Sequence, residues 1–528
     1  MSNFRSFFQE KPPSSKLAVL LISFIALTGL LCLSFLEPNY LTLSGYPLDD
    51  AWIHAVYGRE LARSGLLAYN PGIPSNGCTS PLWALFLSLP HLISTDVDLI
   101  IIMTKTIGFI LHLLTAICLY FALIKVLKWE ASVLAAAIVA FNPDLIAASV
   151  SGMEISLSTL IAALLLLTVQ KGKYLFALFS LVAVLARPEL TILIAALPIM
   201  IHVPFKKKCL FLLAGGIGSS ISWAWSIFRN INLSGRPLPA TYYAKVGTSS
   251  IPITWSLTKG FSELLEKLVI INSSILLTLI LIISLWLIIN QRSPLKWRIP
   301  SAAFLSGLLY CTISFILIPP IDPEAFYHQR YIFPAVPLLI ISFIGVIEVL
   351  ITKLNFSGKK AKMFLLVFLF LAFFSMFIHL PTRFHRLAND TRNIDDVQVA
   401  VGKYLSQAQA KEVAWVVDAG ASRYFGNAFI VDLMGLNNYQ LLGPKAQAFL
   451  DQYSPTYIEV VPGWNALDET SQKILRYIVF KPSTPYTVTS FKPMQVHLLY
   501  QGKPSHRGVI FFRGKSFNFS FARTNIQN

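Results

Sequence analysis

Two adjacent carboxylates, Asp49 and Asp50, stand at the start of a helical stretch that runs from Ala51 to Ser64. A carboxylate in this position can take the proton from a hydroxyl, and such general-base catalysis accelerates reactions by roughly 10²–10⁴-fold. It can also bind a divalent cation through its oxygens. The alternative is helix capping, because aspartate is favoured at the N-cap and in the first turn. We predict Asp49 as the base and Asp50 as the neighbour that binds a hydroxyl or a cation, although the pattern alone leaves open which of the two is the base.

Several further loop segments combine cations, acids and aromatic rings. An arginine can hold two phosphate oxygens at once, and an aromatic ring can stack on a sugar. The alternative is that the cations pair with nearby acids and that the rings anchor membrane spans at the interface. The residues predicted to bind a phosphate are Arg187, Lys245, His328 and Arg330. The residues predicted to contact the substrates are Asn70, Glu154, Glu189, Tyr242, Tyr243 and Tyr331.

Long apolar stretches separate these polar segments. The chain has 528 residues, of which 55% are hydrophobic and 13% are charged, whereas soluble domains average roughly 25% charged residues. Residues 1–380 are therefore predicted to form a polytopic α-helical membrane domain with about eleven spans. The predicted spans are 17–36, 99–124, 131–143, 152–170, 174–186, 189–205, 209–228, 271–290, 299–319, 331–351 and 363–380.

Lysine and arginine are concentrated in connections on one side of these spans, and the positive-inside rule assigns that side to the cytoplasm. The N-terminus is then cytoplasmic in a multi-pass protein of the cytoplasmic membrane. The loops at 37–80, 229–270 and 320–330 share the outer side with the candidate site. To preserve this arrangement, Pro81–Ile93 is predicted to be a re-entrant or surface helix. The connections account for much of the net charge of +17, so nucleic-acid binding is not expected.

The composition changes after the last apolar stretch. Residues 381–528 contain more charge and short β-branched runs, which predict an extracytoplasmic α/β domain. Asp418 and Asp432 are interpreted as turn residues rather than as a second active site. Exposed aromatic residues, such as Tyr424 and Trp464, are expected to help bind the acceptor.

The five cysteines show no metal-type spacing, and only Cys78 falls clearly in an outer loop. Cys78 is therefore expected to react with a membrane-impermeant thiol reagent that is added outside the cell. A cysteine placed at Ser357 is expected to be protected, because it would lie on the cytoplasmic side.

The loops contain an ordered series of short motifs: Asp49–Ile53, Gly65–Gly72, Gly77–Trp83, Ser151–Glu154, Arg187–Glu189, Pro237–Lys245, His328–Tyr331, Asp418–Gly420 and Val431–Leu436. Taken together, they resemble a bacterial glycosyltransferase group with the GT-C fold, like the mycobacterial terminal arabinofuranosyltransferases. The resemblance implies transfer of a sugar from a polyprenyl-phosphate donor, with a catalytic carboxylate in the first outer loop. That position corresponds here to Asp49 or Asp50, and a divalent cation assists some members. The chain departs from the group at Ser75-Asn76 and Cys78, where an acidic and an aromatic residue are often found.

The expected function is therefore an inverting glycosyltransferase that modifies a cell-envelope glycan or lipid on the outer side of the membrane. No cofactor is required by the sequence, although Asp50 could hold a divalent cation. The alternative is a non-enzymatic transporter of lipid-linked saccharide. A transporter should carry polar residues along the middle of several spans, whereas polarity here is concentrated at the ends of the spans.

Overall fold

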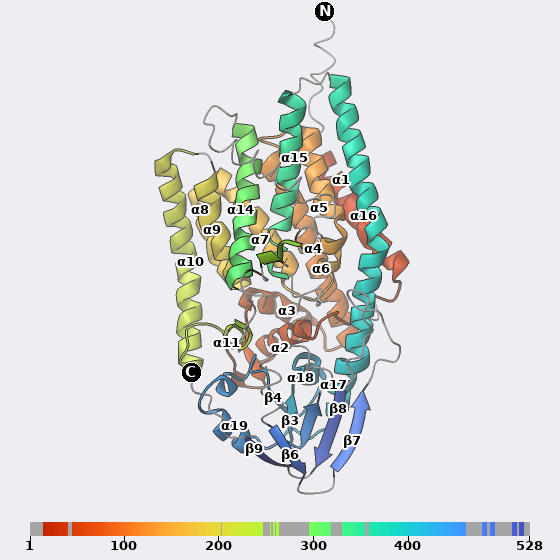
Figure 1. Cartoon of the computed structure of the whole chain (residues 1–528), viewed down its shortest axis with the longest axis vertical. Coiled ribbons are helices and arrows are strands. Elements are labelled where there is room, and N and C mark those ends of the chain that lie inside the picture. Colours follow the sequence, from red (N-terminus) through yellow and green to blue (C-terminus); the bar gives the residue numbers. More distant parts are fainter. Residues whose placement is uncertain are drawn as a thin grey trace, which may run out of the picture.

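The computed structural model shows a bundle of helices joined at one end to a smaller domain that contains a β-sheet (Figure 1). The structure describes residues 14–40, 45–201, 203–246, 295–317, 330–353 and 358–460, single residues and short runs between 254 and 264, and strands at 478–482, 486–491, 509–514 and 517–521. The predicted span 271–290 and the positions His328, Ser357 and Trp464 lie outside these residues, as do parts of the predicted loops 37–80, 229–270 and 320–330.

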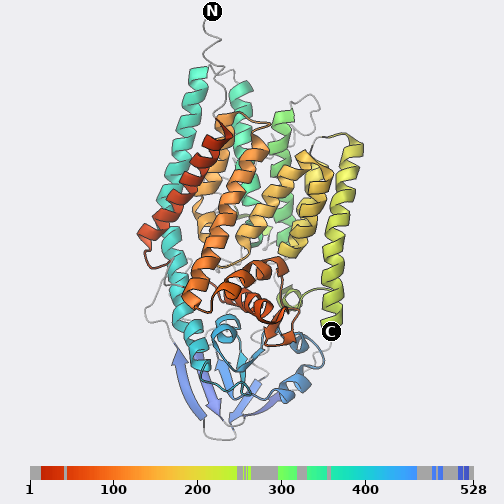
Figure 2. The same ribbon diagram turned by 180° about the vertical axis from the view of Figure 1, so that it is seen from behind.

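The bundle is built from the apolar stretches, and most of its helices run along the long axis of the molecule (Figures 1 and 2). These helices are α1 (Ser15–Leu36), α4 (Val97–Leu123), α5 (Trp129–Phe141), α6 (Pro143–Ser149), α7 (Ile155–Lys171), α8 (Lys173–Ala186), α9 (Thr191–Met200), α10 (Phe205–Ser234), α14 (Leu295–Leu317), α15 (Val336–Lys353) and α16 (Gly358–Ile394). Because α16 continues beyond the last apolar stretch, one helix connects the bundle to the smaller domain.

Among the described helices, four are long and apolar enough to cross a bilayer: α1, α4, α10 and the segment Arg298–Leu317 of α14. The pair α5–α6, which is bent by 55°, would add a fifth. The bend falls at Asn142, whose side chain caps α6 by accepting a hydrogen bond from Leu145 N–H at 3.0 Å. The predicted count of eleven spans is not confirmed, because several apolar helices, such as α8 and α9, are shorter than the ~20 residues that a span needs.

The first predicted outer loop, 37–80, and the segment that follows it form two helices that lie across the end of the bundle (Figure 2). The first, α2 (Asp49–Ser64), ends at Gly65, whose φ of 71° is in the left-handed region that favours glycine. A hairpin of β1 (Ala68–Asn70) and β2 (Ile73–Pro74) follows. The second helix, α3 (Pro81–Ile93), runs across the bundle rather than along it, which agrees with the prediction that this segment does not span the membrane.

The smaller domain contains a five-stranded sheet in the order β4-β3-β5-β8-β7. The strand β3 is parallel to β4 and β5, whereas β8 is antiparallel to β5 and β7. A separate pair, β6–β9, is antiparallel. The strands are β3 (Val413–Val416), β4 (Phe429–Asp432), β5 (Tyr457–Val460), β6 (Ile478–Pro482), β7 (Tyr486–Phe491), β8 (Val509–Gly514) and β9 (Phe517–Phe521). The helical segments are η4 (Asp395–Val399), α17 (Ala400–Leu405), α18 (Gly420–Phe425), η5 (Tyr439–Leu442) and α19 (Ala446–Gln452).

The helix α2 packs against α18 and holds the two parts of the molecule together. The ring of Trp52 lies 4.7 Å from Tyr46, 4.7 Å from Tyr424 and 4.9 Å from Phe425, measured between ring centroids. Arg59 donates a hydrogen bond to the backbone carbonyl of Tyr424 and lies over its ring, 5.1 Å from the centroid. Tyr424 is therefore buried in this interface, and the expectation of an exposed acceptor-binding ring at this position is wrong.

Candidate active site

A cavity of about 490 Å³ lies where α2 meets the ends of the bundle helices. Its volume is within the range of roughly 300–1,000 Å³ that is usual for small-molecule sites. Segments that are far apart in the sequence contribute its charged and phenolic side chains, which include Asp50, Arg187, Glu189, Lys245, Arg330 and Tyr331. The cavity therefore brings together residues from four of the polar segments predicted to form the site.

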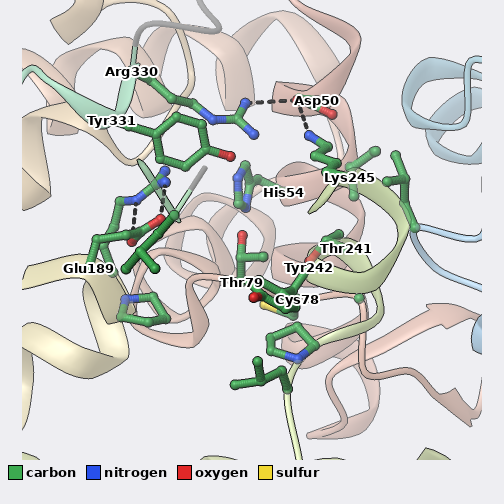
Figure 3. Close-up of a pocket in the computed structure, with 18 of the residues that line it drawn as sticks. Asp50, His54, Cys78, Thr79, Glu189, Thr241, Tyr242, Lys245, Arg330 and Tyr331 are labelled. Atoms are coloured by element: carbon green, nitrogen blue, oxygen red, sulfur yellow. Dashed lines mark hydrogen bonds and ion pairs between the residues drawn. The ribbon is translucent and has the colours of Figure 1, made fainter. Parts of the chain in front are cut away.

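Asp50 is the carboxylate on which two cations converge (Figure 3). It lies in the first turn of α2, and its Oδ2 atom is 2.7 Å from Arg330 Nη1 and 3.4 Å from Lys245 Nζ. Lys245 belongs to α11 (Ala240–Val246), whereas Arg330 comes shortly before α15. Because only 21% of the Asp50 side chain is exposed, this ion pair is screened less by solvent than a surface pair.

Arg187 ends α8 and lies between two carboxylates. Its guanidinium donates to Glu189 at 2.8 and 3.2 Å and also to Glu154. Pro188 starts the short 3₁₀ helix η2 (Pro188–Leu190), which turns Glu189 back toward the arginine. The Arg187 guanidinium also lies over the Tyr331 ring, 4.5 Å from the centroid. The predicted alternative, an Arg187–Glu189 pair, is thus present, and both residues also line the cavity.

His54 also lines the cavity, although it was not among the site residues predicted from the sequence. Its Nε2 atom is 3.1 Å from Glu154 Oε2, and its side chain is almost completely buried. Asp50 and His54 are four residues apart on one helix, and this spacing places two side chains on the same face. That spacing is the signal that could have identified it. His54 supports Glu154, which lies behind the cavity wall and holds Arg187 in place.

The structure places Asp49 outside the cavity, in the contact with the smaller domain. Its two carboxylate oxygens accept hydrogen bonds from Gly420 N–H at 2.6 Å and Ala421 N–H at 2.8 Å. These N–H groups belong to the start of α18, where a helix offers unpaired donors. Asp49 therefore caps a helix that is remote in the sequence, and the geometry does not favour it as the base. Of the two adjacent aspartates, Asp50 is the one whose carboxylate lines the cavity and could take a proton from a bound hydroxyl.

Asn70 and Tyr243, which were predicted to contact the substrates, do not line this cavity. The side chain of Asn70 accepts from Ile430 N–H at 3.1 Å and donates to its carbonyl at 2.9 Å, so Asn70 binds the β1–β2 hairpin to β4. Tyr242 lines the cavity, whereas Tyr243 lines a second cavity that is described below. The position of Asn70 corrects its assignment to the substrate site, since its amide is already paired with the backbone.

Cys78 lines the cavity but is only 4% exposed. Burial raises the pKa of its thiol to about 11, which leaves little of the reactive thiolate at neutral pH. The expectation that Cys78 reacts readily with a thiol reagent added outside the cell is therefore wrong for the folded protein.

The two aspartates of the smaller domain have local partners. The Asp432 carboxylate accepts hydrogen bonds from the backbone N–H groups of Met434 and Asn437 at 3.0 and 2.8 Å, which is the behaviour of a turn residue. Asp418 accepts from the Gln398 amide at 2.7 Å. In the part of the chain that the structure describes, no group of three or more His, Cys, Asp or Glu side chains is arranged to hold a metal ion. A divalent cation at Asp50 stays a prediction.

The contact between α2 and the smaller domain is expected to weaken as the pH rises. Burial, together with the nearby Asp418 charge, raises the pKa of Asp49 to about 8, although two backbone N–H groups favour its ionised form. Burial likewise raises the pKa of Glu459, and it raises that of Asp432 to about 6. An aspartate in the unfolded chain has the ordinary pKa of 3.8 and releases its proton above that pH. The folded protein keeps the proton of Asp49 to a higher pH. Stability therefore falls with rising pH through this window.

The melting temperature of the protein in detergent is accordingly expected to fall by several degrees from about pH 6 to about pH 8.5. Asp49→Asn should flatten this dependence, because the side chain is then neutral throughout. Asp98→Asn, which changes an exposed carboxylate at the start of α4, should leave the slope unchanged. A variant at position 49 with the wild-type slope would contradict the assignment.

The chain is similar to solved structures in its fold but only weakly similar to them in sequence. A family model described as a domain of unknown function (DUF8728) matches residues 392–509, and no curated protein matches the sequence. The apo oligosaccharyltransferase of Archaeoglobus fulgidus aligns with a TM-score of 0.57 at 11% identity, over 98% of this chain and 76% of that one. AglB of the same organism, in complex with an inhibitory peptide and a dolichol-phosphate, aligns with a TM-score of 0.53 at 11% identity, over 97% of this chain and 75% of that one.

ArnT from Cupriavidus metallidurans, bound to undecaprenyl phosphate, aligns with a TM-score of 0.50 at 11% identity, over 93% of this chain and 98% of that one. Identity this low supports a conclusion about the fold alone. The finer resemblance to mycobacterial terminal arabinofuranosyltransferases is not confirmed. The chain is a helical membrane protein with the GT-C fold.

Proposed function

We propose that the protein is an inverting glycosyltransferase that uses a polyprenyl-phosphate sugar as its donor. One observation carries the proposal: a partly buried carboxylate, Asp50, shares one cavity with three cations, Arg187, Lys245 and Arg330, at the end of an apolar bundle. A glycosyl transfer from a lipid phosphate needs a base for the acceptor and positive charge for the leaving phosphate. Two solved structures with the same fold support the proposal, since they hold undecaprenyl phosphate and a dolichol-phosphate.

In this mechanism, Asp50 takes the proton from an acceptor hydroxyl while that oxygen attacks the anomeric carbon of the donor. The bond between the anomeric carbon and the phosphate oxygen breaks, and the lipid phosphate leaves with the electron pair. Arg330 and Lys245 stabilise the charge that develops on the phosphate. Attack from the face opposite to the leaving group inverts the configuration at the anomeric carbon.

The pairing of Asp50 must be broken or shared during the reaction, because Arg330 and Lys245 both pair with it in this structure. A donor phosphate would compete for the same two cations. Asp50 would then be free to accept the proton of the acceptor hydroxyl.

The donor lipid would enter from the bundle side of the cavity. This part of the wall is formed by apolar residues of three helices, namely Ile192 of α9, Trp223 of α10 and Leu317 of α14. Trp223 is fixed by a hydrogen bond from its indole N–H to the Thr191 hydroxyl at 3.1 Å. An apolar wall on one side and a cationic wall on the other match the two ends of a polyprenyl phosphate.

The arrangement of the basic connections supports the predicted sidedness. The α4–α5, α7–α8 and α9–α10 connections lie at the end of the bundle that is remote from the sheet (Figures 1 and 2). Lysines lie in or beside all three, including Lys125, Lys171 and Lys207. By the positive-inside rule this end is cytoplasmic, so the active site and the smaller domain face the outside.

A labelling experiment tests this orientation. In a variant that lacks the native cysteines, Lys411→Cys should react with an impermeant maleimide added to spheroplasts, whereas Lys207→Cys should react only after permeabilisation. Both lysines are exposed, and they lie at opposite ends of the molecule in the smaller domain and at the start of α10. The reverse labelling pattern would invert the proposed topology.

Transfer itself is tested with the purified protein in nanodiscs, where both faces of the bilayer are accessible and transport yields no product. Lipid extracts of a deletion strain should supply the accumulated polyprenyl-phosphate sugar, and its envelope glycans should supply the acceptor. We expect the sugar to move to the acceptor and free polyprenyl phosphate to appear in equal amount. Binding of the lipid without either product would favour the transporter.

A further inference from the structure

A second cavity, of about 390 Å³, lies between the end of α10, α11 and the smaller domain. Figure 1 shows α11 beside the end of α10 and above the smaller domain. The wall includes Tyr243 from the bundle side and the η5 segment from the domain side. We propose that this cavity binds the acceptor and that the acceptor is an acidic saccharide. The proposal rests on the proposed function, because it names the second substrate of the same reaction.

Unpaired polar groups in the wall indicate a polar ligand. Asn76 is only 1% exposed, yet neither atom of its side-chain amide has a hydrogen-bond partner among the described residues. The carbonyl of the Gln440 side chain is also buried without such a partner. A buried polar group without a hydrogen-bond partner destabilises the folded protein. A ligand rich in hydroxyl groups could satisfy both amides, since a hydroxyl donates as well as accepts.

The charge of the wall favours an anionic ligand. Arg236 and Lys445 both line the cavity, and its described wall residues include no aspartate or glutamate. The first cavity differs in this respect, because each of its cations has an acidic partner. Arg236 is already held by the Leu442 carbonyl at 3.0 Å and by the Tyr243 ring at 4.9 Å. A wall with one fixed guanidinium, a second cation and two tyrosines, Tyr243 and Tyr439, fits a sugar that carries a carboxylate or phosphate.

The two cavities share a thin wall, so an acceptor could extend from one to the other. Asn76 and Ala240 line the second cavity, whereas the next residues, Gly77 and Thr241, line the first. The two segments are joined by a hydrogen bond from Ala240 N–H to the Asn76 carbonyl at 3.2 Å. Neighbouring residues are about 3.8 Å apart along the chain. One sugar unit could therefore reach toward Asp50 while the preceding unit stays in the second cavity.

The test measures binding to the full-length protein in nanodiscs. The probes are tetragalacturonate, its methyl ester, which keeps the sugar rings but lacks the charge, and undecaprenyl phosphate. Wild type should bind the acid at least tenfold more tightly than the ester. Replacing both cations, with Arg236→Gln and Lys445→Gln, should weaken acid binding at least tenfold. A matched control, Lys403→Gln with Lys411→Gln, removes two exposed lysine charges from the same domain and should bind like wild type.

Asn76→Leu separates ligand binding from a structural role. Since its amide has no described partner, the substitution should weaken saccharide binding at least tenfold without lowering the melting temperature. Equal affinity for acid and ester, or full binding by the double cation variant, would overturn the proposal. In all these variants the affinity for undecaprenyl phosphate should stay unchanged. Wild type that binds the saccharide but not undecaprenyl phosphate would instead contradict the proposed function: the cavity would still be a site for acidic saccharide, but its ligand would not be the acceptor of this reaction.

Discussion

Asp50→Asn is expected to reduce sugar transfer by at least ~10²-fold, whereas the adjacent Asp49→Asn should keep most of the activity. Asparagine preserves the shape of the side chain but cannot accept the proton of the acceptor hydroxyl. Only Asp50 lines the cavity with Arg330 and Lys245, while Asp49 accepts hydrogen bonds from the start of α18. The comparison of two neighbouring residues with the same substitution therefore tests the geometry rather than the sequence motif. The measurement is the initial rate in nanodiscs with saturating donor.

The same variant should separate catalysis from donor binding. Asp50→Asn leaves Arg330 and Lys245 without their carboxylate partner, so the two cations become more available to a phosphate. Undecaprenyl phosphate is therefore expected to bind the variant as tightly as wild type or more tightly. A loss of rate with retained binding would identify a group that acts in the transition state. If Asp49→Asn instead abolishes transfer while Asp50→Asn remains active, the assignment of the base is wrong.

The sequence predicted those features that depend on local pattern. Apolar length located the helices of the bundle, and the lysine bias grouped the polar segments at one end. The short apolar stretch of α3 was predicted not to span, and it lies across the bundle. Arg187, Lys245 and Arg330 were predicted to bind one phosphate and Glu189 to contact the substrate, and all four line the cavity. Charge and hydropathy act over single helices and connections, so they can be recognised without the fold.

Tertiary contacts decided the features that the sequence could not predict. Asp49 and Asp50 are equivalent as a motif. Only Asp49 caps the start of α18, which lies more than 350 residues later in the chain. Tyr424 was expected to be exposed because loop aromatics often are, and it packs on Trp52. His54 is different, since its spacing from Asp50 was visible in the sequence. Its functional context, the contact with Glu154, depends on the approach of α7.

The second large effect is expected at Arg330. Replacement by methionine should lower the rate at saturating donor by ~10²–10³-fold, the usual cost of removing one donor that stabilises charge in a transition state. Replacement by lysine should cost at least tenfold, because lysine keeps the charge but lacks the planar fork that holds two phosphate oxygens. Arg63 provides matched controls, since Arg63→Met and Arg63→Lys change an exposed arginine on α2 and should leave the rate unchanged.

The geometry around Arg330 explains why the rate, rather than binding alone, should respond. One nitrogen, Nη1, pairs with Asp50 at 2.7 Å, while Nε is buried and has no partner among the described residues. The guanidinium also lies 5.4 Å from the centre of the Tyr331 ring, which Arg187 faces as well. The ring thus fixes both arginines before the phosphate arrives, and fixed donors stabilise developing charge without reorganisation. If Arg330→Met raised the donor KM but kept the wild-type kcat, Arg330 would serve only to hold the donor in the ground state, and the leaving-group role would pass to Lys245 or Arg187.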